Sequence, residues 1–180
     1  MSTIYLDMDG VVANWDLAAE QYIGRPRRPD PHDPDAEHRW AHQDWLKIRG
    51  NQRFFSDLPL MPGALELADQ AREFRDYLGW ELMFLTAIPR HNDCPWAFHD
   101  KMSWANRHFP DIPVHFGPYS HDKQTHCRPG DVLVDDRTSN ILEWRARGGT
   151  AIQVLQGSVW PAIEDLGALF QERSGAQKIF

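Results

Sequence analysis

The chain has 180 residues, of which 42% are hydrophobic and 12% aromatic, so it is long enough to bury a substantial core and too apolar to be intrinsically disordered. Two independent domains are not expected at this length. Nineteen basic residues against 26 acidic ones give a net charge of −7, which repels polyanions and argues against long nucleic acid as a partner.

Five short apolar runs have the length of β-strands and lack strict alternation, as expected of strands that are covered on both faces. They are Ile4–Leu6, Leu82–Leu85, Ile112–Phe116, Val132–Val134 and Ala151–Leu155. Helical spacing of apolar residues predicts helices over Gly63–Leu78, Trp96–Phe109 and Ser139–Arg147. In the second of these, Phe98 and Met102 share one side with Phe109. Strands that alternate with helices predict an α/β fold with a Rossmann-like, doubly wound parallel sheet.

The segment 15–58 interrupts this alternation, because Arg25–Asp35 is crowded with Pro, Arg and Asp and cannot form one regular element. Residues Glu37–Arg49 are predicted to form a short helix that carries Trp40 and Trp45. We therefore expect a small helical cap over residues 15–58, inserted after the first strand, on a core made of residues 1–14 and 59–180.

Polar side chains stand where the predicted strands end, and in open α/β sheets these carboxyl ends line the ligand crevice. Asp7 and Asp9 follow the first strand, Thr86 the second, and Asp135 and Asp136 the fourth. Four carboxylates at one edge repel one another unless a cation or protons compensate, and hard oxygen ligands suit Mg²⁺. The Thr86 hydroxyl and Lys123, shortly before the fourth strand, can both donate to phosphate oxygens. Together these residues predict magnesium-dependent phosphoryl transfer.

The chain resembles the haloacid dehalogenase-like phosphatases in four ordered motifs, which are Asp7-x-Asp9-Gly-Val, Thr86, Lys123 and Asp135-Asp136. The resemblance implies that Asp7 is the nucleophile that forms an aspartyl-phosphate, and that Asp9 protonates the leaving alcohol and then activates water. It also implies that Mg²⁺ contacts the Asp7 carboxylate, the Asp9 main-chain carbonyl and Asp136, while Asp135 orients a metal-bound water. Thr86 and Lys123 would hold the transferring phosphoryl group.

A more specific resemblance is to the 5'(3')-deoxyribonucleotidases of that superfamily. It rests on Phe54-Phe55 through Pro59, Met61-Pro62-Gly63-Ala64, Leu85-Thr86-Ala87-Ile88-Pro89, and Val132 through Arg137. In those enzymes a small cap after the first motif closes over the nucleotide, and aromatic side chains stack on its base, which contributes on the order of 1–3 kcal/mol. The candidates for base stacking are Trp15, Trp45, Phe54 and Phe55. Each of these rings can equally serve to pin the cap to the core.

Two further phosphate contacts are expected from the same resemblance. It places Lys101 on a helix near the phosphate, with an exposed surface lysine as the open alternative. The chain departs from the familiar pattern after Thr86, where Ala87 stands in place of a second hydroxyl. A backbone N–H at Ala87 is expected to substitute for that hydroxyl.

The expected function is Mg²⁺-dependent hydrolysis of nucleoside monophosphates, with deoxyribonucleotides favoured, to nucleoside and phosphate. The alternatives are a phosphatase of the same superfamily that acts on a sugar phosphate or a polynucleotide end, and a non-catalytic binding module. The expected partner is a small-molecule nucleotide, and a homodimer is left open. No run of about 18 apolar residues occurs and the two cysteines form no disulfide framework, so we expect a cytoplasmic protein without a membrane span.

Overall fold

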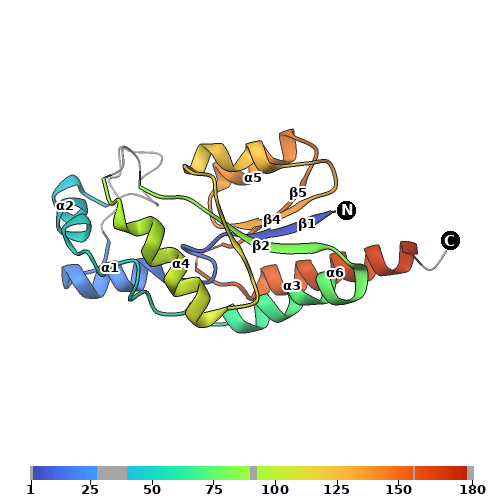
Figure 1. The fold of residues 1–180 in the computed structure, drawn as a ribbon, viewed down its shortest axis with the longest axis horizontal. Helices are drawn as coiled ribbons and strands as arrows, with labels where there is room; N and C mark the ends of the chain where they lie inside the picture. Colours follow the sequence, from blue (N-terminus) through green and yellow to red (C-terminus); the bar gives the residue numbers. More distant parts are fainter. Residues whose placement is uncertain (1, 28–39, 90–92, 156, 178–180) are drawn as a thin grey trace.

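The computed structural model describes residues 2–27, 40–89, 93–155 and 157–177, in which five parallel strands form one sheet of order β3-β2-β1-β4-β5 (Figure 1). The strands are β1 Thr3–Leu6, β2 Glu81–Thr86, β3 Val114–Phe116, β4 Val132–Asp135 and β5 Thr150–Gln153. The helices are α1 Trp15–Ile23, α2 His42–Gly50, α3 Ala64–Leu78, α4 Trp96–His108, α5 Thr138–Ala146 and α6 Trp160–Gln177, and a 3-10 helix, η3, spans Ser120–His126. Each helix in the described ranges is too short or too polar to cross a membrane. The predicted α/β fold with a parallel sheet is confirmed.

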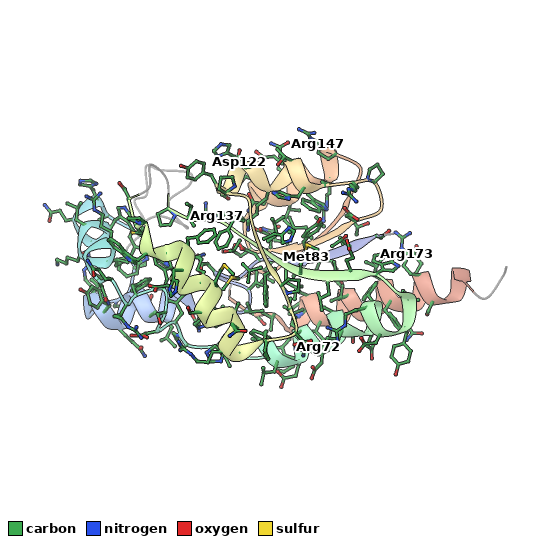
Figure 2. All side chains as sticks on the ribbon, viewed as in Figure 1. Arg72, Met83, Asp122, Arg137, Arg147 and Arg173 are labelled. Carbon is green, nitrogen blue, oxygen red and sulfur yellow. The ribbon has the colours of Figure 1, made fainter. Side chains whose placement is uncertain are left out.

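Helices cover both faces of the sheet, so successive residues of one strand face different layers. Ile4 and Leu6 of β1 belong to the core cluster that includes residues of α3 and α6, whereas Tyr5 packs with α5 through Trp144, with ring centroids 5.2 Å apart. Figure 1 shows α5 above the sheet and α3 and α6 below it, and Figure 2 shows side chains filling both spaces. This double coverage explains why the strands are continuous apolar runs in the sequence.

One strand prediction needs correction, and one helix was not predicted. β3 begins at Val114 rather than at Ile112, because Pro113 between them has no N–H to donate to the sheet. The C-terminal helix α6 was not predicted, and it contains Gly167 and Gly175, each of which disfavours a helix by about 1 kcal/mol relative to alanine. The helix is stabilised by packing on α3, where a Cβ on Gly167 would lie only 3.4 Å from a side-chain atom of Gln70.

Helix α4 buries only part of the predicted apolar side, on which Phe109, just after the last helical residue, is buried. Phe98 and Met102 are 48% and 43% exposed, whereas Lys101 and Trp104 are buried. The Trp104 indole donates a hydrogen bond to the Leu58 carbonyl at 2.7 Å, which anchors the inward side of the helix. Apolar spacing misled the prediction because the inward side carries a lysine.

The same helix buries a carboxyl group, that of Asp100, which is 8% exposed. Its Oδ2 atom is buried and has no hydrogen-bond partner among the described residues. Burial raises the pKa of Asp100, while the charges of Arg53 and His99 act in the opposite direction. A group of this kind favours folding most when it carries its proton.

We expect the Asp100 carboxyl group to make the free energy of unfolding depend on pH. The folded chain binds the Asp100 proton more tightly than the unfolded chain, in which the pKa of an Asp is about 3.9. The free energy of unfolding therefore falls as the pH rises from that value through the raised pKa of Asp100. In Asp100→Asn the loss is absent, so urea unfolding at stepped pH should show a variant-minus-wild-type difference that grows from acid to neutral pH and then levels. A difference independent of pH would contradict this assignment.

Two helices, α1 and α2, follow β1 and lie together at one end of the molecule beside α4 (Figure 1). Asn14 caps α1 by accepting a hydrogen bond from the Leu17 N–H at 3.1 Å. An ion pair between Arg25 and the buried Asp44 joins the end of α1 to α2. The predicted helical segment after the first strand is therefore present, but α2 begins at His42, so Trp40 precedes the helix that was predicted to carry it. Residues 28–39 lie outside the described residues, so the cap bounds 15–58 stay a prediction.

Candidate active site

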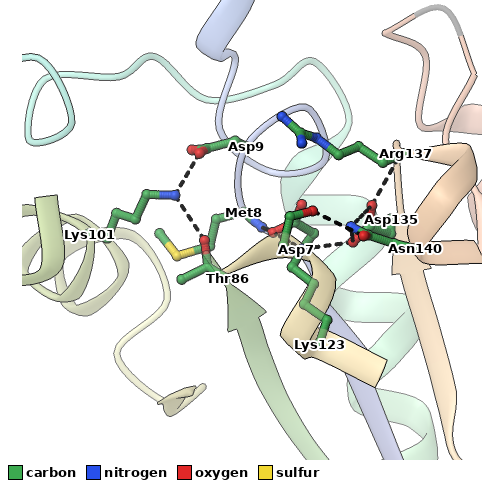
Figure 3. Close-up of polar contacts among 10 residues, drawn as sticks. Asp7, Met8, Asp9, Thr86, Lys101, Lys123, Asp135, Arg137 and Asn140 are labelled. Carbon is green, nitrogen blue, oxygen red and sulfur yellow. Dashed lines mark hydrogen bonds and ion pairs between the residues drawn. The ribbon is translucent and has the colours of Figure 1, made fainter. Parts of the chain in front are cut away.

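Three carboxylates meet where β1 and β4 end, and Figure 3 shows two of them, Asp7 and Asp135. Asp7 follows β1, Asp135 is the last residue of β4, and Asp136 comes next. The two strands are parallel neighbours, and the Asp7 N–H donates to the Val134 carbonyl at 2.9 Å, so their carboxyl ends lie side by side. One oxygen of each of the three carboxylates lies within 4.8 Å of the others. The structure therefore brings three of the four predicted carboxylates together.

Lys123 in η3 joins two of these carboxylates. Its Nζ lies 2.7 Å from Asp7 Oδ1 and 2.7 Å from Asp135 Oδ2, and the side chain is 2% exposed. Burial alone would lower the pKa of Lys123, but the Asp135 and Asp7 carboxylates outweigh burial and raise it above its usual range. The lysine therefore remains charged and offsets two buried negative charges.

Asp135 has its oxygens occupied by donors. Besides Lys123, it accepts the Arg137 N–H at 2.9 Å on Oδ1, and the Asn140 amide lies 2.9 Å from both oxygens. Asn140 is buried on α5, and its own Oδ1 accepts the Ser120 hydroxyl at 3.0 Å. The sequence prediction missed Asn140, although a polar residue one helical turn after a strand-end carboxylate could have suggested it.

Asp136 is placed differently, because no described residue donates a hydrogen bond to its carboxylate. The carboxylate packs against Gly10, whose φ of 77° lies in the left-handed region that favours glycine. A Cβ at Gly10 would stand 2.4 Å from Asp136 Oδ2, so any other residue there would displace this carboxylate. The Asp136 oxygens are thus held close to Asp7 without being occupied by protein donors.

The three-carboxylate group has the donor chemistry of a site for a hard divalent cation. Burial raises the pKa of Asp136 well above its usual value, and the neighbouring Asp135 and Asp7 charges add to this effect. Burial also raises the pKa of Asp7, although Lys123 opposes the shift. The negative charges of Asp7 and Asp136 are therefore only partly compensated by the protein, and a bound cation would compensate them further. Because Asp135 is already saturated with donors, Asp7 and Asp136 carry the freer oxygens.

A second lysine centre lies beside this group. Lys101 Nζ is 2.6 Å from Asp9 Oδ2 and 2.9 Å from the Thr86 hydroxyl (Figure 3), and the lysine is 1% exposed, so it is no surface side chain. The Asp9 carboxylate thus lies outside the three-carboxylate group and forms an ion pair with Lys101. The other Asp9 oxygen, Oδ1, is buried without a hydrogen-bond partner in the described part of the chain. Ala87 follows Thr86 directly at this edge.

The aromatic candidates differ in how close they come to these residues. The ring centroid of Phe55 lies 5.5 Å from Lys101 Nζ, so this ring contacts the second lysine centre. Phe54 packs edge-on against Phe55 at 5.4 Å and against Trp15 at 5.5 Å between centroids, and both phenylalanines are buried. Trp15 and Trp45 are partly exposed. Phe55 is therefore the candidate that the structure brings to the site, while base stacking by any of the four stays a prediction.

Comparison with known proteins gives one family match. Residues 1–158 match the family described as 5' nucleotidase, deoxy (pyrimidine), cytosolic type C protein (NT5C). No curated protein matches the sequence. Among solved structures, a hydrolase from Pseudomonas syringae is 13% identical, with 93% of this chain and 91% of that chain covered and a TM-score of 0.47. A HAD hydrolase of family IA, variant 3, from Entamoeba histolytica is 15% identical, with 86% and 84% covered and a TM-score of 0.43.

Proposed function

Because the chain belongs to the 5' nucleotidase, deoxy (pyrimidine), cytosolic type C family, whose members are phosphoric monoester hydrolases, we propose that it hydrolyses deoxyribonucleoside monophosphates to nucleoside and phosphate. The observation that carries the proposal is the pair of lysine centres at the ends of β1, β2 and β4. In the first centre Lys123 contacts Asp7, and in the second Lys101 contacts Asp9.

Asp7 is the nucleophile of the proposed reaction. Its Oδ1 accepts the Met8 N–H at 2.7 Å and the Lys123 ammonium at 2.7 Å, so Oδ2 is the oxygen left for attack on phosphorus. The new bond joins Asp7 to the phosphoryl group, and the bond from phosphorus to the sugar oxygen breaks. Lys123 favours the ionised form of Asp7 against the burial that raises its pKa, because an ammonium at hydrogen-bond distance stabilises the charged form.

Asp9 is the proton donor and acceptor of the proposed reaction. It gives a proton to the departing sugar oxygen, and it then takes a proton from the water that attacks the aspartyl-phosphate and releases phosphate. Lys101 and the Thr86 hydroxyl lie at this end of the site and are suited to donate to phosphoryl oxygens. The pairing of Lys101 with Asp9 positions both residues before phosphate is bound.

Mg²⁺ is the proposed cofactor, held by the Asp7 and Asp136 carboxylates with the Asp9 main-chain carbonyl, and when bound it would neutralise charge on the phosphoryl oxygens. Asp135 acts on this site through Lys123 and Asn140, since its oxygens are taken up by their donors. In this proposal Asp135 orients its neighbours instead of binding the cation directly.

The nucleotide specificity of the proposal rests on the family description and on the aromatic ring beside Lys101. Phe55 brings an apolar surface to the phosphate end of the site, and Trp15 extends the same aromatic cluster through Phe54. The matched family is named for pyrimidine deoxyribonucleotides, and these are the favoured substrates in this proposal.

The test is phosphate release from a panel of ribo- and deoxyribonucleoside monophosphates, sugar phosphates and an aryl phosphate, each with Mg²⁺ and with EDTA. We expect Mg²⁺-dependent release, with the highest kcat/KM for pyrimidine deoxyribonucleoside monophosphates, and no release in EDTA. An Asp7→Asn preparation serves as the control for contaminating phosphatase. Release confined to sugar phosphates would reassign the substrate, and no release from any ester would overturn the proposed reaction.

A further inference from the structure

A side chain of β5, that of Gln153, contacts the main chain of Asp136 in the three-carboxylate group. β5 pairs with β4 in parallel register, with Gln153 opposite Asp135, so Gln153 stands at the same edge of the sheet as the carboxylates. Its side-chain Nε2 donates to the Asp136 main-chain carbonyl at 3.2 Å and to the Thr138 hydroxyl at 2.9 Å. One amide group therefore holds both ends of the short connection from β4 to α5.

This contact matters because Asp136 depends on its main chain for its position. The Asp136 carboxylate receives no hydrogen bond from the described residues. Gly10 restricts the position of the carboxylate only by van der Waals contact. A carboxylate that binds a cation must be held in place by the groups around it, since ligand orientation sets much of the affinity. The Gln153 amide is the side-chain donor that fixes the backbone from which this carboxylate extends.

We propose that Gln153 is a positioning residue for the divalent-cation site, acting through the Asp136 main chain. The proposal rests on the proposed function only in taking Asp136 as a cation ligand. Without the amide donor, the Arg137 N–H bond to Asp135 still holds part of the connection after β4, but the Asp136 carbonyl loses its side-chain donor. The Asp136 carboxylate then spends less time at the distance from Asp7 that a cation requires. The effect should fall on cation affinity, while the attack by Asp7 and the proton transfer by Asp9 are unchanged once the cation is bound.

The test replaces Gln153 by methionine, which has a similar length and no donor. A lost hydrogen bond is worth about 0.5–1.5 kcal/mol, so we expect the Mg²⁺ concentration for half-maximal activity to rise roughly 2- to 10-fold. At saturating Mg²⁺, kcat and the KM for substrate should match the wild-type values. Direct Mn²⁺ binding, measured from the electron paramagnetic resonance signal of the free ion, should weaken by the same factor without any substrate.

The matched control is Gln70→Met on α3, whose amide donates to Glu73 at 2.6 Å, because it makes the same chemical change outside the site. Gln153→Asn is a second variant, which keeps the amide but shortens its reach, and it should weaken Mn²⁺ binding in the same direction. Unchanged Mn²⁺ affinity in both Gln153 variants, with only a lower Tm, would overturn the proposal. If the wild-type protein binds Mn²⁺ but releases no phosphate, the reaction is wrong while this inference is still decided by the binding data.

Discussion

Asp9→Asn is expected to lower kcat by about 10²- to 10⁴-fold, the usual contribution of a positioned acid and base. Asparagine keeps the shape of the side chain and can still contact Lys101, which lies 2.6 Å from Asp9 Oδ2, but it cannot give or take the proton. The measurement is steady-state phosphate release at saturating Mg²⁺ from the best substrate of the panel. Mn²⁺ binding should remain close to wild type, because the Asp9 carboxylate lies outside the three-carboxylate group.

Asp165→Asn provides the control for this substitution. Asp165 is an exposed residue of α6, and the same chemical change there should leave kcat unaltered. Full activity in Asp9→Asn would exclude the proposed proton transfer. A parallel loss of Mn²⁺ binding would instead assign the Asp9 carboxylate, in addition to its main-chain carbonyl, to the cation site.

Lys123→Met is expected to have the largest effect on stability. Lys123 Nζ bonds to Asp7 and Asp135 at 2.7 Å each, and all three side chains are buried. Removing one partner of a buried ion pair leaves an uncompensated charge and costs about 3–5 kcal/mol. Urea unfolding in EDTA should show a loss of this size, and Mg²⁺ should restore part of it by supplying positive charge to the same carboxylates.

Lys47→Met is the matched control for this loss. The exposed Lys47 ammonium lies 3.9 Å from the buried Asp44, which also pairs with Arg25, so the loss of this solvated lysine should cost about 0–1 kcal/mol. If Lys123→Met were no less stable than Lys47→Met, the lysine would not be compensating Asp7 and Asp135. Phosphate release by Lys123→Met should also be lost, since the Asp7 carboxylate would no longer be held ionised.

The ends of β1 and β4 were predictable from the sequence because they depend on local patterns of apolar and acidic residues. A buried run followed by aspartate predicts a strand with a carboxylate at its end, and parallel strands of one sheet end at the same edge. Asp7, Asp135 and Asp136 therefore meet as expected, whatever the details of packing. Lys123 needed the resemblance as well, because a lysine in a short 3-10 helix has no local signal of burial.

The inward side of α4 could not be predicted in the same way. The helix exposes the apolar residues Phe98 and Met102. It buries Lys101, because Asp9 and Thr86 each provide an acceptor for the lysine ammonium. A buried charge is stable only with such partners, and these partners come from two other elements of the chain. Hydrophobic spacing within one helix contains no information about them.

The sequence by itself determined the fold class, the strands that end in carboxylates and the residue types needed for phosphoryl transfer, because these follow from local patterns of burial and from motif order. Only the tertiary structure decided that Lys101 pairs with Asp9, that Asn140 saturates Asp135, and that Gln153 holds the Asp136 main chain. Each of these contacts joins residues from different parts of the chain. Their existence depends on distances of about 3 Å that packing sets and that spacing along the chain does not encode.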